Sequence, residues 1–281
     1  MDSDKQKKEE LLMTLSSKSI LNSWVTCPQP RANARLRLFC LPYAGGNAAI
    51  YHTWAERLPA EIEVCPLQLP GRGSRFSESL LNQMTVLVPD LAQAILPALQ
   101  LPFALFGHSM GALIGFELVR YLRRHYRLQP EVFISSGHYA PHLSKPDPAL
   151  ATLPQNRFIE AIRNYNGTPT AFFEDQELME LVLPVLRADF SICETYHYTP
   201  EEPLDCPIIA YGGTQDPDAD PVDLLAWRDQ THRNVSVRVF PGDHFYIETV
   251  SDLLLRSLIK DLREFATPLM ERRTRKDSEH E

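Results

Sequence analysis

The sequence has few of the features that mark membrane, nucleic-acid-binding or disulfide-rich proteins. No apolar run approaches the roughly 18 residues that a membrane-spanning helix needs, so we expect no membrane span. Lys and Arg number 28 against 36 Asp and Glu, which gives a formal charge of -8. Because a surface for nucleic-acid backbone usually appears as an excess of basic residues, this balance argues against a nucleic-acid partner.

Cysteine is scarce and irregularly placed. The five cysteines are widely spaced, odd in number and without a CxxC pair: Cys27, Cys40, Cys65, Cys193 and Cys206. This pattern indicates neither a disulfide framework nor a zinc site, and we expect no metal. The charged start of the chain, MDSDKQKKEE, is not followed by the apolar segment of a secretory signal. We therefore expect a cytoplasmic protein. We also expect it to be a monomer.

The 281 residues contain an alternation of short apolar runs and longer helical patterns, with 44% hydrophobic and 23% charged residues overall. Strands are expected at 35–41, 62–67, 103–106, 131–135, 207–211 and 235–240. Helices are expected at 48–58, 84–100, 110–126, 223–229 and 251–265. Nearly continuous apolar strands that alternate with helices predict an α/β fold, with a mostly parallel central sheet flanked by helices on both faces.

Residues 145–203 interrupt this alternation, because they contain no convincing strand and indicate two or three helices. We interpret them as a helical lid over the strand ends, where ligands bind in such sheets. The alternative is that they only extend the core. Residues 34–144 and 204–266 would form the core, between a flexible N-terminal arm at 1–33 and a charged C-terminal tail at 267–281. We expect Phe172, Phe173 and Met179 to line or gate a substrate tunnel under the lid.

The segment FALFGHSMGAL is the most informative part of the chain. An apolar strand leads into a G-x-S-x-G motif and a helix follows at once, which is the context that a serine nucleophile requires. Gly107 and Gly111 would leave room for a strained turn that exposes the hydroxyl of Ser109. The new helix points its N-terminus at the reaction centre, which favours developing negative charge. The alternative is that Ser109 merely caps the helix.

A serine nucleophile needs a base and an orienting carboxylate, in the chain order Ser, Asp or Glu, then His. His244 follows the last expected strand and its Pro-Gly turn, whereas the other histidines have the wrong order or position. Asp216 follows the strand before it and is our choice for the acid. Asp218 and Asp220 are close rivals that could instead be solvated or cap a helix.

An oxyanion hole needs two backbone N–H groups. One should come from Met110, the residue after the nucleophile. The other should come from the loop after the first strand, where Gly45 and Gly46 allow close approach of the backbone. Ala44 is the preferred donor there, and Tyr43 is the alternative.

Seven segments carry a resemblance to one enzyme family: LPYAGGNAAIYHTWAERLP, LQLPGRGSR, FGHSMGALIGFELVR, SSGHYAPHL, LMELVLPVLRADFSICETYHY, LDCPIIAYGGTQDP and FPGDHFYI. In this combination the chain resembles the type II thioesterases of nonribosomal peptide and polyketide synthesis, a branch of the α/β-hydrolase superfamily. The resemblance covers residues 35–265. It implies the same triad, Ser109, Asp216 and His244, and the same oxyanion hole. The chain departs from the family pattern at Tyr43, where we expect His, and at Ser74, where we expect an acidic residue.

The resemblance also implies a reaction: hydrolysis of an acyl group from the phosphopantetheine arm of an acyl or peptidyl carrier protein, without a cofactor. The role would be to remove stalled or wrongly primed groups. The same triad leaves open a medium-chain acyl thioesterase, an esterase or an acyltransferase, and a hydrolase fold can also serve as a non-catalytic binding module.

Docking of a carrier protein raises a question of charge. Carrier proteins are typically acidic, so a chain at -8 would need a local basic patch to receive one. The candidate arginines are Arg72, Arg75, Arg120, Arg123, Arg124 and Arg127. The alternative for those at 120–127 is that they only complement the end of a helix.

Overall fold

A six-stranded, wholly parallel sheet forms the centre of the protein in the computed structural model, which describes residues 22–143, 149–164, 175–217 and 219–266. The strand order is β2-β1-β3-β4-β5-β6. The strands are β1 (Leu36–Leu41), β2 (Ile62–Pro66), β3 (Phe103–His108), β4 (Val132–Ser136), β5 (Ile208–Gly213) and β6 (Val235–Phe240). The α/β fold with a parallel sheet that the sequence predicts is confirmed, and each expected strand is present.

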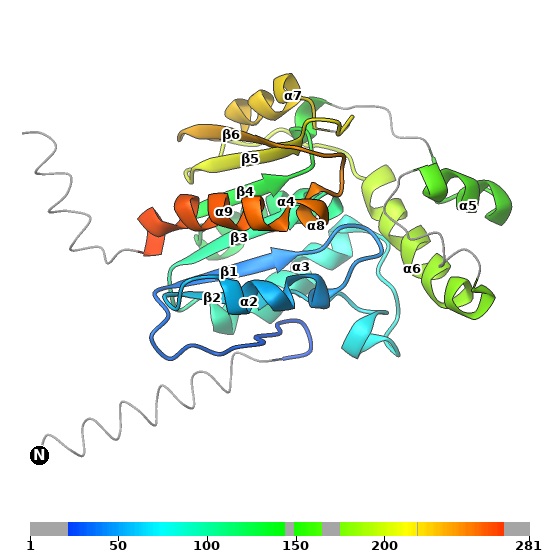
Figure 1. Ribbon diagram of the computed structural model, residues 1–281, viewed down its shortest axis with the longest axis horizontal. Coiled ribbons are helices and arrows are strands. Elements are labelled where there is room, and N and C mark those ends of the chain that lie inside the picture. The colour runs from blue at the N-terminus through cyan, green and yellow to red at the C-terminus, as the bar shows by residue number, and fades with distance from the viewer. Residues whose placement is uncertain (1–21, 144–148, 165–174, 218, 267–281) are drawn as a thin grey trace, which may run out of the picture.

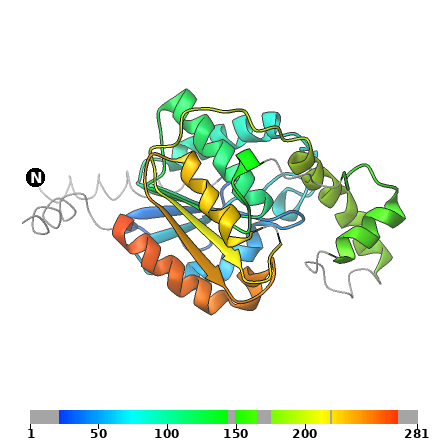
Figure 2. The ribbon, with the colours of Figure 1, turned by 90° about the horizontal axis from the view of Figure 1, so that it is seen from above.

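The sheet is covered on both faces, which explains why its strands are almost continuously apolar. Successive side chains of β1 enter opposite cores: Leu36 and Leu38 pack on one face, and Phe39 and Leu41 on the other. All residues of β1 to β5 are buried, whereas β6 at the edge of the sheet is only partly buried. Figure 2 shows helices above and below the sheet.

Two groups of helices make these covers (Figure 1). One face carries α3 (Met84–Ile95), α4 (Met110–Tyr126), α7 (Pro221–Leu225) and the 3-10 turn that follows α7, whose Trp227 is fully buried. The other carries α2 (His52–Arg57), α8 (Tyr246–Thr249) and α9 (Ser251–Ala266). The bounds of α4 are those that the sequence predicts, 110–126.

The described part of the inserted segment forms two helices that project from one end of the sheet, α5 (Gln155–Asn164) and α6 (Gln176–Glu194) (Figure 1). They share a small apolar cluster of their own, built on Leu150, Phe158, Ile162, Leu183 and Leu186. Met179 packs against this cluster, so its expected part in a substrate tunnel stays a prediction. Phe172 and Phe173 lie outside the described residues.

Residues 22–33, the described part of the N-terminal arm, pack against the core, and the flexibility expected for the whole arm stays a prediction. Val25 is buried and forms an antiparallel bridge with Leu67, just beyond β2. The backbone N–H of Arg31 donates to the carboxylate of Glu63 at 2.8 Å. In the described part of the chain, no helix has the length and apolar character to cross a bilayer.

Candidate active site

The turn between β3 and α4 places Ser109 in a strained backbone conformation. Its φ of 55° and ψ of −122° lie in a region that residues other than glycine rarely adopt. A Cβ atom at Gly107 would overlap the carbonyl group of Gly111, and a Cβ atom at Gly111 would overlap the carbonyl of Leu41. Both glycines of the motif are therefore required sterically, as the sequence predicts.

The alternative that Ser109 serves as a helix cap is not supported. Ser109 occupies the N-cap position of α4, yet its side chain makes no capping hydrogen bond. Its backbone N–H donates instead to the carbonyl of Ser136 on β4 at 2.7 Å. The turn is thus fixed through its backbone, and the side chain is not engaged in the cap.

His244 and Asp216 come together at the same edge of the sheet. Nδ1 of His244 lies 2.9 Å from Oδ2 of Asp216, whose side chain is fully buried, while the imidazole is 12% exposed. Because an ionised carboxylate only accepts hydrogen bonds, Nδ1 carries the proton in the neutral ring and Nε2 has the lone pair of a base.

The other aspartates that could orient His244 either make other hydrogen bonds or lie outside the described residues. Asp220 caps α7 by accepting from the N–H of Val222. Asp243 accepts from the N–H of Phe245. Asp218 falls outside the described residues. Among the described candidates, the contact with the His244 ring belongs to Asp216.

His108, which we set aside as a base because of its place in the chain, is part of the site's support. Its Nε2 lies 2.9 Å from the carbonyl oxygen of His244, so Nε2–H must be the donor. Nδ1 then accepts from the hydroxyl of Ser136 at 2.9 Å, and that oxygen lies 2.5 Å from the hydroxyl of Tyr246. This buried chain ties the His244 backbone to β3, β4 and α8.

This network needs His108 in its neutral form, with the proton on Nε2. Burial lowers the pKa of His108 well below its ordinary value of 6.5, and the neighbouring His244 lowers it further. The other rings against it are Tyr43 and Tyr246. A lone histidine at the end of an apolar strand was the available signal for this residue, but its partners are 28 and 136 positions away.

The loop after β1 forms a tight turn beside the nucleophile. The N–H of Gly46 donates to the carbonyl of Tyr43 at 2.9 Å, and the N–H of Gly45 donates to the Asp189 carboxylate at 2.7 Å. These two N–H groups are therefore committed within the protein, which leaves Ala44 and Tyr43 as the candidates that the sequence named. Met110 is the first residue of α4, where backbone N–H groups have no acceptor within the helix.

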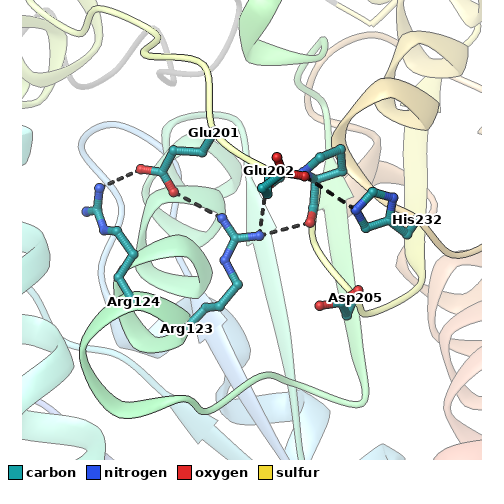
Figure 3. Close-up of a pocket in the computed structure, with 7 residues that line it drawn as sticks. Arg123, Arg124, Glu201, Glu202, Asp205 and His232 are labelled. Carbon is teal, nitrogen blue, oxygen red and sulfur yellow. Dashed lines mark hydrogen bonds and ion pairs between the residues drawn. The ribbon is translucent and has the colours of Figure 1, made fainter.

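The arginines that could have formed a basic docking patch are mostly paired within the chain. Arg120 is buried against Glu117 and Glu201, and Glu201 also pairs with Arg123 and Arg124. Figure 3 shows the last two pairs at the wall of a polar recess of about 620 Å³. Arg72 and Arg75 pair with Asp189 and Glu78. This pairing within the chain favours a structural role for these arginines over a role in docking a carrier protein.

One cluster of side chains among the described residues has the composition of a metal site: Cys27, Glu63 and Cys65. Both oxygens of Glu63 are already used, one by the N–H of Arg31 and the other by the guanidinium of Arg37 at 2.6 Å. Burial and the hydrogen bond with Cys27 raise the pKa of the Cys65 thiol, which opposes the thiolate that a metal needs. The cluster therefore fits a structural role better.

Replacing Gly107 by Ala should prevent correct folding of the nucleophile turn. The new methyl group would meet backbone of Gly111, which cannot move without disrupting α4, so we expect a loss of at least about 3 kcal/mol of unfolding free energy. Gly115→Ala is the matched control, because its Cβ would meet side-chain atoms only, of Phe133 at 3.0 Å and of Leu41 at 3.4 Å. Urea denaturation of both variants measures the difference, and equal losses would contradict the steric argument.

The neutral state of His108 should make stability fall in acid. A folded pKa below 6.5 means that the unfolded chain binds more protons, so stability decreases as pH falls below about 6.5, by up to about 1.4 kcal/mol per pH unit. His108→Gln keeps a donor for the His244 carbonyl but does not titrate. Melting temperatures between pH 7.5 and 5.5 should fall less steeply for this variant than for the wild type. Parallel curves would contradict the assignment.

Comparisons with known proteins show the family of the chain. The family model described as "Thioesterase domain" matches residues 36–264. The chain is 42% identical over 250 residues to the gramicidin S biosynthesis protein GrsT of Aneurinibacillus migulanus, covering 89% of this chain and 98% of that protein. It is 44% identical to a protein of Brevibacillus parabrevis named linear gramicidin dehydrogenase LgrE, covering 86% and 93%.

A solved structure is also similar. The type II thioesterase BorB from the borrelidin biosynthetic cluster superposes with a TM-score of 0.79 at 33% identity, covering 86% of this chain and 98% of that one. The family match, the extent of these alignments and the shared fold agree with one another. The chain therefore belongs to the type II thioesterases of nonribosomal peptide and polyketide synthesis, within the α/β-hydrolase superfamily.

Proposed function

We propose that this thioesterase hydrolyses acyl groups from the phosphopantetheine arm of carrier proteins, with Ser109, His244 and Asp216 as its catalytic triad. The observation that carries the proposal is the hydrogen bond between the His244 imidazole and the buried carboxylate of Asp216. The strained turn that carries Ser109 supports it. The names of the relatives, which refer to gramicidin S and borrelidin biosynthesis, support a synthase as the source of the substrate. We also propose that the protein is a monomer and that it acts in the cytoplasm.

The mechanism follows from the proton positions. Nε2 of His244 takes the proton of the Ser109 hydroxyl as its oxygen attacks the thioester carbonyl. The N–H groups of Ala44 and Met110 hold the oxyanion that forms. The intermediate collapses, the C–S bond breaks, and the imidazolium returns its proton to the departing thiol. Water then attacks the acyl-serine with the same base, and the acid is released with Ser109 restored.

Asp216 has the part of an orienting group in this scheme. Its carboxylate keeps the proton of His244 on Nδ1 and stabilises the imidazolium that forms during attack. Full burial of the Asp216 side chain strengthens this interaction, because little water screens it.

Ser109→Ala should lower turnover of an acyl-loaded carrier protein by about 10⁴-fold or more, since no nucleophile remains. The Tm should stay close to that of the wild type, because Ala adopts the same strained conformation at a similar cost. Turnover within tenfold of the wild type would contradict the proposal.

A paired substitution in one loop tests the acid. Asp216→Asn should lower kcat by about 10²- to 10⁴-fold, because the amide favours the wrong tautomer of His244. Asp220→Asn is the matched control, since Asn caps a helix about as well as Asp, and its kcat should stay within about twofold. Equal losses in the two variants would contradict the choice of Asp216.

The substrate class is tested by a panel. Carrier proteins loaded with acyl groups of different length should be hydrolysed well, as should acyl N-acetylcysteamine thioesters, whereas oxygen esters of the same acids should react poorly. The reverse preference would favour an esterase, and transfer of the acyl group to an added thiol or alcohol in place of water would favour an acyltransferase.

A further inference from the structure

Asp189, on the lid helix α6, is a fully buried carboxylate that the catalytic scheme does not use. It accepts three hydrogen bonds. Two come from the Arg72 guanidinium, at 2.5 and 2.7 Å, and the third comes from the backbone N–H of Gly45 at 2.7 Å. The network thus joins three segments: Asp189 lies on α6, Arg72 in the loop after β2 and Gly45 in the loop after β1.

A buried ion pair of this kind is costly unless every group in it is satisfied. Here the guanidinium is 6% exposed and the carboxylate is not exposed at all. The pair is bidentate, which fixes the relative orientation of its two planes as well as their distance. Nothing in the packing of α5 against α6 requires this charge, because the lid has its own apolar cluster.

The third hydrogen bond selects the conformation of the turn that carries Ala44. The turn Tyr43–Gly46 is closed by its terminal hydrogen bond, and Gly45 has a φ of +79°. This value is typical of the third residue of a type II turn, which differs from type I by a flip of its central peptide. The N–H of Gly45 belongs to that peptide, so Asp189 anchors it, and with it the adjoining Tyr43–Ala44 peptide that carries the N–H of Ala44.

The surrounding contacts leave this turn little freedom. A Cβ atom at Gly45 would come within 2.6 Å of the Leu186 side chain, so α6 lies directly against the turn. On the other side, Nε2 of Gln68 donates to the carbonyl of Arg72, and Oε1 of Gln68 accepts from the N–H of Ala48. Asp189 therefore joins the lid to a turn that the core already clamps.

We propose that Asp189 is a positioning residue for the oxyanion hole, which couples the seating of the lid helix on the core to the geometry of the Ala44 turn. Arg72 presents the carboxylate to the Gly45 N–H. When α6 is seated, the central peptide of the turn is held in its type II state. When α6 moves away, the turn loses this acceptor. The inference rests on the proposed function, because it takes Ala44 as an oxyanion donor.

Asp189→Asn and Arg72→Lys test the inference with small changes in volume. The Asn variant loses the bidentate pair and presents an amide N–H₂ to one of its donors. We expect kcat for an acyl N-acetylcysteamine thioester to fall about 10- to 100-fold, less than the 10²- to 10³-fold cost of a whole donor, with KM changed less than about threefold. Arg72→Lys keeps a charged donor and should lie between the Asn variant and the wild type.

Glu63→Gln is the matched control. It breaks a second buried ion pair, the one between Arg37 on β1 and Glu63 on β2, whose side chains are 8% and 5% exposed. All variants are assayed at least 15 °C below their own Tm. The Glu63 variant should lose stability and keep kcat within about twofold once corrected for folded fraction. If Asp189→Asn keeps kcat within twofold, or loses it only in proportion to folded fraction, the inference is overturned.

A phosphonate ester that modifies the nucleophile gives a readout that a merely structural role would not change. Its phosphoryl oxygen occupies the oxyanion position, so the second-order rate of modification should fall in Asp189→Asn by the same factor as kcat. A rate equal to that of the wild type would also overturn the inference. Ser109→Ala separates the two proposals: if it retains turnover, the proposed function has failed, whereas its inactivity beside a fully active Asp189→Asn rejects only the positioning role.

Discussion

Close contact between backbones at the end of β3 is the constraint on which the rest of the site depends. Gly111, the second residue of α4, lies against the carbonyls of Leu41 and Pro42 at the end of β1. The nucleophile turn and the Ala44 turn are therefore packed backbone to backbone, with no side chain between them. This contact brings the N–H of Met110 and the loop after β1 to one place, which an oxyanion hole requires.

The parallel sheet then collects the remaining groups. Because the carboxyl ends of parallel strands meet at one edge, the residues that follow β1, β3, β5 and β6 converge there although they are distant in the chain. β4 lies between β3 and β5 and supplies the support: the carbonyl of Ser136 fixes the N–H of Ser109, and its hydroxyl fixes His108. Gly137 leaves room for the imidazole rings of His108 and His244, since a Cβ at this position would lie 2.8 Å from the first ring and 3.4 Å from the second.

The sequence predicts those parts of this arrangement that depend on local pattern. The strands are readable because burial on two faces makes them apolar throughout, and the G-x-S-x-G turn because it needs glycine at fixed positions. Asp216 and His244 follow from the order of strands. The roles of His108 and Asp189 depend on contacts across 28 to 144 residues, and no periodicity reports such contacts. The arginines of α4 gave a basic pattern whose neutralisation by Glu201 is visible only in three dimensions.

The distribution of buried charge separates the groups that react from those that hold them. Each of Asp216 and Asp189 is a buried carboxylate, and each is stabilised by donors from a segment far along the chain. In the proposed mechanism, Asp216 faces a ring that must gain and lose a proton, so its negative charge is used in the reaction. Asp189 faces a guanidinium that never titrates and an amide N–H, so its charge can only fix geometry. Since α6 supplies Asp189 and the core supplies its three donors, a movement of α6 away from the core would remove an acceptor from the turn that carries Ala44. Under the proposed function, the seating of α6 would then contribute to the assembly of the oxyanion hole.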